Sequence, residues 1–278
     1  QYDDVRGSQV FASLRLRVPL QAEPRRGTLT YQERRMTDPI VRDIDIVAQV
    51  QTVTAPSVTE AATATAAGNT LAVVNAASTS GANLQAAVTG AGANSTVVLS
   101  GTFNTTTTTT LQAGQTVVGS APIAVRTASG RNATVTPSGG ATIASTVGGS
   151  TNPAVAMASN STLAGMTISR TAGGGLVNPV GVHADGVSGV TISGNTITTT
   201  STGAGTAFGV RILNGASGSV TNNTITATNT STGIAIAAQV AGGGASATVS
   251  GNTLSGTGTP GRTVDLVGPV SVSGTGNV

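Results

Sequence analysis

Hydrophobic and polar positions alternate with a period of two over the second half of the chain. Between residues 161 and 255, four short segments align without gaps and place Met166, Asn195, Asn223 and Asn252 in one column, at spacings of 29, 28 and 29 residues. Two apolar columns run through the same segments. Their members are Leu163, Ile192, Val220 and Val249 in one column and Ile168, Ile197, Ile225 and Leu254 in the other. Such alternation, rich in Val, Ile and Thr, predicts short β-strands.

The repeat length predicts how these strands are arranged. Strands that recur every ~28 residues without an intervening helix cannot form strand–helix–strand units. The chain can instead coil so that each turn lies on the previous one at the inter-strand distance of about 4.8 Å. A second apolar segment precedes each aligned one, and it places His183, Arg211, Ala235 and Asp265 in one outward column. We therefore predict an all-β fold, a parallel β-helix (solenoid) of roughly seven turns over residues 67–278.

The asparagine column is predicted to mark a bend between two strands. Asn195, Asn223 and Asn252 belong to a residue type that tolerates the left-handed backbone region. The residues before them, such as Gly194 and Gly251, also accept a positive φ. Two interpretations of this structural turn column remain open. The asparagines could simply permit the bend, or their stacked side chains could hydrogen-bond to one another along the axis.

The first fifty residues differ from the repeats. Apolar residues alternate with Arg15 and Arg17 over residues 10–20, which fits either a membrane-spanning strand or an edge strand of a soluble sheet. Residues 51–66 are rich in Thr, Ala and Val and have the composition of a linker. Because the repeat pattern runs up to Val278, we expect the β-helix to be truncated there and the chain to be an excerpt of a longer protein.

Two stretches resemble known families. The sequence SLRLRVPL (13–20), followed by YQERRMTDPIVRDIDIV (31–47), resembles the end of the outer-membrane β-barrel in inverse-autotransporter-type proteins. In that family the barrel anchors the protein, and a passenger is exported through it and displayed outside the cell. The sequence NLQAAVTGAGANSTVVLSGTFN (83–104), followed by QTVVGS (115–120), resembles the opening turn of pectate-lyase-like right-handed β-helices. This resemblance implies a right-handed coil whose first turn is capped by a short helix within residues 82–91.

Composition narrows the candidate chemistry. All thirteen basic residues are Arg, and eight of them precede position 43, so the repeats have no basic face for nucleic acid. The chain has no cysteine, which excludes disulfides and thiolate metal sites. The single His and the scattered carboxylates suggest neither a metal site nor a cofactor.

The β-helix resemblance raises the possibility of polysaccharide cleavage. His183, Asp185 and Arg211 could lie together on one outward face, and we treat them as weak catalytic candidates. The competing interpretation is a surface ion pair, since hydrolases of this kind need two carboxylates at a defined separation and Asp265 lies three turns away.

The sequence therefore predicts a displayed structural or adhesive β-helix without a catalytic role, anchored in the bacterial outer membrane through an upstream barrel. It would act as an adhesin, a stalk, or a matrix- or filament-forming module at the cell surface. Expected partners are further copies, joined end to end or side by side, or a surface glycan or other ligand on a host or neighbouring cell; nucleic acid is not expected. The alternative is a secreted polysaccharide lyase or glycoside hydrolase of the pectate-lyase-like fold.

Overall fold

The computed structural model describes residues 2–3, 7–8 and 59–278, which belong to two separate compact units, residues 1–58 and 59–278. In the first unit, β1 (Tyr2–Asp3) and β2 (Gly7–Ser8) pair antiparallel. The predicted barrel strand within residues 10–20 and the charged connector that follows it lie outside the described residues.

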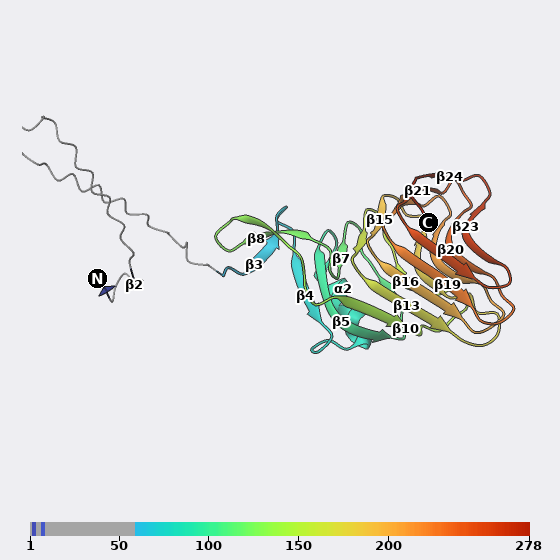
Figure 1. The fold of residues 1–278 in the computed structure, drawn as a ribbon, viewed down its shortest axis with the longest axis horizontal. Coiled ribbons are helices and arrows are strands. Elements are labelled where there is room, and N and C mark those ends of the chain that lie inside the picture. Colours follow the sequence, from blue (N-terminus) through green and yellow to red (C-terminus); the bar gives the residue numbers. More distant parts are fainter. Residues whose placement is uncertain (1, 4–6, 9–58) are drawn as a thin grey trace, which may run out of the picture. The chain divides into compact units, whose positions relative to one another are not determined.

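Residues 71–273 form three faces of parallel strands that coil into a β-solenoid of about seven turns, as the sequence predicts (Figure 1). The first sheet contains β4 (Leu71–Asn75), the first half of β5 (Thr96–Thr105), β7 (Thr116–Val118), β12 (Thr162–Ala164), β15 (Val190–Ser193), β18 (Ser217–Thr221), β21 (Ser246–Ser250) and β24 (Ser271–Ser273). The second sheet contains the second half of β5, β10 (Ala141–Ser145), β13 (Thr167–Ala172), β16 (Thr196–Ser201), β19 (Thr224–Asn229) and β22 (Thr253–Thr257). The third sheet contains β6 (Thr109–Thr110), β11 (Pro153–Ala156), β14 (Val180–Asp185), β17 (Ala207–Leu213), β20 (Ala235–Ala241) and β23 (Gly261–Val267).

The strand register confirms both apolar columns. In the first sheet Leu163 pairs with Ile192, which pairs with Val220, which pairs with Val249. The second sheet pairs the members of the other column in the same way. These members are Ile168, Ile197, Ile225 and Leu254. Equivalent apolar side chains therefore stack from turn to turn.

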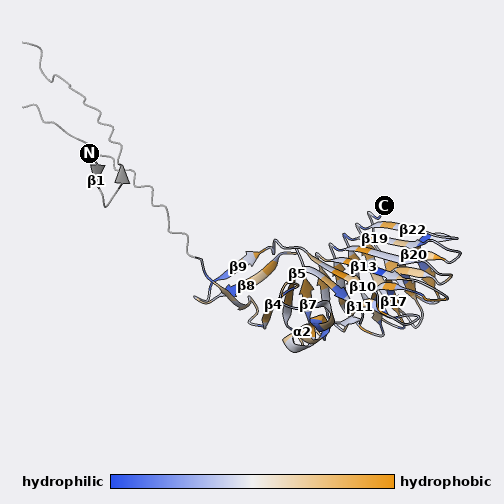
Figure 2. Cartoon of the chain, turned by 90° about the horizontal axis from the view of Figure 1, so that it is seen from below, coloured by the Kyte–Doolittle hydropathy of each residue, from blue (hydrophilic) through white to orange (hydrophobic). Residues whose placement is uncertain are grey.

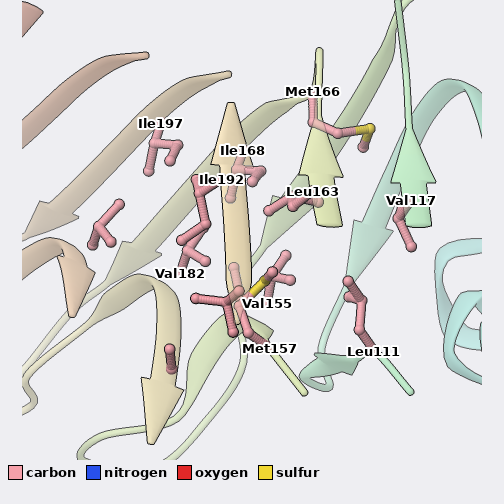
Figure 3. Packing of buried hydrophobic residues seen from close by; sticks show 14 of the residues in the cluster. Leu111, Val117, Val155, Met157, Leu163, Met166, Ile168, Val182, Ile192 and Ile197 are labelled. Atoms are coloured by element: carbon pink, nitrogen blue, oxygen red, sulfur yellow. The ribbon is translucent and has the colours of Figure 1, made fainter. Parts of the chain in front are cut away.

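These stacked side chains form one continuous core inside the coil. Figure 3 shows Leu163 and Ile192 from the first sheet, Ile168 and Ile197 from the second, and Val182 from the third, all directed into the interior. All five side chains are fully buried. Hydrophobic residues recur along the stacked strands in Figure 2, as expected for strands with one buried face.

A short helix covers the first end of this core. Helix α2 (Leu84–Ala91) follows a 3-10 turn, η1 (Gly81–Asn83), and buries Leu84 and Val88 completely against the core. The chain then enters β5, in which Val97, Leu99 and Phe103 are also fully buried. The cap helix implied by the resemblance of residues 83–104 is therefore present.

A small antiparallel sheet interrupts the repeat between β7 and β10. It consists of β8 (Ile123–Thr127), β9 (Asn132–Val135) and β3 (Ala62–Thr65), with β8 in the middle. Residues 62–65 are thus a paired strand, although the composition of residues 51–66 suggests a linker. Ile123 and Ala121, at the base of β8, pack on Val98 and Val118 of the first sheet and cover part of its outer face.

Candidate functional site

The polar column on the outside of the third sheet has one member that differs from the prediction. His183, Arg211, Gln239 and Asp265 occupy successive strands in register, so Gln239 stands where the sequence alignment places Ala235. Ala235 instead pairs with Ala207, four residues earlier in β20. The alternation that guided the alignment is lost in β20, because most of its residues are small or apolar and nearly all are buried.

The later members of this column form a hydrogen-bonded chain. Arg211 Nε donates to Gln239 Oε1 at 2.9 Å, and Gln239 Nε2 donates to Asp265 Oδ2 at 2.8 Å. The other oxygen of Asp265 accepts from Arg262 Nη1 at 2.5 Å in a salt bridge. The Arg211 guanidinium also lies 4.1 Å from the ring centre of Phe208, which is the geometry of a cation–π contact. These contacts fix the Arg211 side chain on the surface of the sheet.

His183, the first member of the column, has fewer hydrogen bonds than the later members. His183 is half-buried, and its Nε2 atom has no hydrogen-bond partner among the described residues. Burial lowers the pKa of His183 below its ordinary value, the positive charge of Arg211 lowers it further, and the carboxylate of Asp185 opposes both effects. The imidazole is therefore neutral at pH 7.

Asp185 completes the group of three weak catalytic candidates, but it makes its hydrogen bond elsewhere. Its Oδ1 atom accepts from Asn214 Nδ2 at 2.7 Å. Its negative charge still acts on Arg211, because it opposes the lowering of the Arg211 pKa by burial. The structure therefore brings His183, Asp185 and Arg211 onto adjacent strands without joining them by hydrogen bonds among themselves.

The carboxylates are far apart for two-carboxylate hydrolysis. Asp265 lies on β23, three strands from β14, which carries Asp185, so the two carboxylates are separated by about 14 Å along the axis at the usual inter-strand spacing. The carboxylates of retaining and inverting glycosidases are roughly 5 to 9.5 Å apart. In the part of the chain that the structure describes, no three His, Cys, Asp or Glu side chains lie close enough to hold a metal ion.

The asparagine column is a hydrogen-bonded ladder. Asn195 Nδ2 donates to Asn223 Oδ1 at 3.0 Å, and Asn223 Nδ2 donates to Asn252 Oδ1 at 3.0 Å. Each amide nitrogen also donates to a backbone carbonyl of the preceding turn, such as Leu163 or Ile192. Each amide oxygen accepts a backbone N–H of that same turn, so one side chain links three turns. This geometry decides between the two interpretations of the column in favour of the ladder.

The ladder also contains a member that the sequence alignment missed. Asn277 Oδ1 accepts a hydrogen bond from Asn252 Nδ2 at 3.1 Å, and Asn277 Nδ2 donates one to the carbonyl of Val249 at 2.8 Å. The signal is present in the sequence, because Gly276 precedes Asn277 as Gly251 precedes Asn252. The positive φ that the bend requires belongs to this preceding position. It is occupied by Gly165, Gly194, Asn222, Gly251 and Gly276, with φ between 56° and 71°.

A shallow depression of about 350 Å³ lies outside this bend. The bend residues Gly165, Gly194 and Asn222 line it, together with Ser193 and the segment 120–122 that leads into β8. No titratable side chain lines it, so it offers no acid–base chemistry.

Arg170 is a buried charge that the sequence analysis did not single out. It follows Ile168 by two residues in β13 and therefore points into the coil, where it is 1% exposed. Its Nη2 atom donates to the carbonyl of Val147 at 2.6 Å and Nη1 donates to the carbonyl of Thr171 at 2.5 Å. Burial lowers the pKa of Arg170. Its contacts to the loop carbonyl of Val147 and to the carbonyl of Thr171 in its own strand give it a structural role at the edge of the core.

No helix in the described part of the chain is both long and apolar enough to cross a membrane. No protein-family model and no curated protein matches the sequence. A structural search found similarity to the crystal structure of the Dettilon tailspike protein (gp208), with a TM-score of 0.38 and 16% sequence identity. The match covers 70% of this chain and 46% of the tailspike chain.

Proposed function

We propose that this chain is the displayed β-helix of a bacterial cell-surface protein and acts as a stalk or adhesive module. The observation that carries the proposal is the uninterrupted in-register stacking of the second and third sheets from β10 and β11 to the last turn. The asparagine ladder ties the same turns together at the bend. Such a stack is stiff along its axis, which suits a module that holds a surface away from its anchor.

The anchor on this proposal is an outer-membrane barrel that precedes the β-helix. Support comes from the resemblance of residues 13–20 and 31–47 to the end of an inverse-autotransporter barrel. The partners would be a glycan or other ligand on a host or neighbouring cell, or further copies of the chain joined end to end or side by side.

A second candidate function is cleavage of a polysaccharide, as a secreted lyase or hydrolase. One observation favours it: a neutral, half-buried His183 with an unpartnered Nε2 stands next to Arg211 and near Asp185 on one face. Against it, Arg211 is held by Gln239 and Phe208, and a second carboxylate lies three turns away. We therefore place catalysis second.

Cell fractionation of the native producer tests the display proposal. An antibody against residues 59–278 should detect a polypeptide in the outer-membrane fraction that resists extraction by high salt. Protease added to intact cells should cleave this polypeptide, because it is displayed on the outside. A polypeptide found only free in the medium would contradict anchoring and display.

Purified protein then separates the two candidates. The triple variant H183A/D185A/R211A should leave adhesion to cells or glycans unchanged, because these residues are not the adhesive surface on this proposal. If the wild-type chain cleaved a polysaccharide and the triple variant did not, catalysis would replace display as the function. Circular dichroism of the variant shows whether it retains the β-helix.

A further inference from the structure

The outer face of the second sheet carries a regular array of hydroxyl groups. Three outward positions on each of the strands β13, β16, β19 and β22 are occupied by Thr or Ser. The members of this threonine array are Thr167, Ser169, Thr171, Thr196, Thr198, Thr200, Thr224, Thr226, Thr228, Thr253, Ser255 and Thr257. The pairing is in register over six consecutive residues between β13 and β16 and between β16 and β19, and over five between β19 and β22. Figure 1 shows β13, β16 and β19 side by side, running in the same direction.

The hydroxyls of the array are available to solvent. Eight of the twelve residues are exposed and the others are half-buried. None of the twelve side chains makes a hydrogen bond to another group within residues 59–278 (compare the asparagine ladder, in which every amide is used). Each hydroxyl can therefore donate one hydrogen bond and accept two from water.

The array has two fixed repeats. Neighbouring strands place equivalent hydroxyls about 4.8 Å apart, and alternate residues along a strand are about 6.6 Å apart. The twelve residues thus cover about 14 Å by 13 Å. One column continues for two more turns through Thr142 and Thr102. Because threonine is branched at Cβ and stiff at χ1, equivalent side chains on stacked strands keep the same orientation.

We propose that the threonine array is an ice-binding surface. Its two repeats come close to the distances between oxygen atoms on faces of hexagonal ice, so waters held by the hydroxyls lie where a growing lattice would place them. Ice is electrically neutral, and among the described residues no charged side chain points outward from the second sheet. The third sheet, in contrast, carries the charged residues Asp185, Arg211 and Asp265 on its outer face.

The second sheet fits this partner better than the first sheet does. The first sheet also has outward hydroxyl columns, such as Ser193, Thr221 and Ser250 beside the column of Thr162, Thr191 and Thr248. Its strands are only three to five residues long beyond β5. Some of its hydroxyls are also used within the protein, because Ser217 Oγ accepts the Gly189 N–H and Ser250 Oγ accepts the Thr275 N–H. Part of its outer face is also covered by β8 and the segment leading into it. The inference goes beyond the display function and does not rest on it, because the purified chain carries the array whether or not it is anchored to a cell.

The test uses the purified chain of residues 1–278 and two matched variants. T198Y places a ring in the centre of the array, and T191Y places the same ring on the outer face of the first sheet. Tyrosine is well tolerated in strands, so both variants should fold, and circular dichroism with thermal melting checks this. Binding is measured as thermal hysteresis, inhibition of ice recrystallisation, and incorporation of a fluorescently labelled chain into a growing ice crystal.

We expect the wild-type chain and T191Y to be active at similar concentrations. We expect T198Y to require roughly tenfold more protein or to be inactive, because a ring standing above a flat face prevents close contact around it. A wild-type chain without ice activity, or with retention only on neutral glycans, overturns the proposal. Equal losses in T198Y and T191Y overturn the assignment to the second sheet. Neither result bears on outer-membrane display, which fractionation tests separately.

Discussion

At the scale of single residues, the asparagine ladder is a stabilising feature that a point substitution can test. Asn223 is 2% exposed and bonds to Asn195, to Asn252 and to two backbone groups of the neighbouring turn. In N223A the backbone N–H of Asn195 and the carbonyl of Ile192 lose these partners inside the protein. Leaving buried polar groups unsatisfied should lower the free energy of unfolding by on the order of 2–3 kcal/mol, measured by denaturant titration.

The neighbouring residue supplies the control for this prediction. Asn222 is exposed and has a φ of 56°, a conformation that glycine adopts without strain. N222G should therefore change the unfolding free energy by about 0.5 kcal/mol or less. Equal effects of N223A and N222G would show that the bend, rather than the ladder, stabilises this corner.

Some of the residues at these positions could be predicted from the sequence, and others could not. Asn195, Asn223 and Asn252 could be predicted because a bend imposes a recurring residue type at a fixed spacing. Gln239 could not, because the small residues around it give no alternation from which the register could be read. Arg170 follows the inward pattern of β13, but hydropathy alone does not indicate that the backbone carbonyls of Val147 and Thr171 would accept hydrogen bonds from its guanidinium.

At the scale of elements, helix α2 is the cap of the coil, and its inner face can be tested. Leu84 is fully buried against the core, whereas Ala86 on the same helix is exposed. Truncating a buried leucine removes apolar contacts and leaves a cavity, so L84A should cost about 2–5 kcal/mol of unfolding free energy. The exposed substitution A86Q should cost about 0.5 kcal/mol or less.

Thermal and denaturant unfolding of both variants measure this difference. If L84A lowered the unfolding free energy no more than A86Q does, packing of the helix against the core would contribute little to the stability of the solenoid. Amide hydrogen exchange in β4 and β5 of the two variants measures how far solvent reaches the first turn. It tests the role of the helix as a cap independently of unfolding.

Most elements of the coil could be predicted from the sequence, and one group could not. The strands of the repeats and the cap helix each have a local signal, either a period of two or a helical spacing of apolar residues. The antiparallel sheet of β3, β8 and β9 has no such repeat, and it joins residues 62–65 to residues 123–127, far apart in the chain. A pairing of this kind depends on how the ends of the strands meet in space, which composition does not encode.

At the scale of the whole solenoid, the two ends of the described stack differ, and this difference predicts where it opens first. Each turn is stabilised mainly by its neighbours, so a turn with one neighbour is the least stable unless something covers it. Helix α2 covers the first turn, whereas Val264 and Leu266 in β23, which pair with the buried residues Ala238 and Val240 of β20, are 38% and 53% exposed. For a purified chain of residues 1–278, amide hydrogen exchange followed by mass spectrometry should therefore be fastest in β22–β24, slowest in β13–β20, and slow in β4 and β5. A first turn that exchanges as fast as the last one, or uniform exchange across all turns, would contradict opening from the uncovered end.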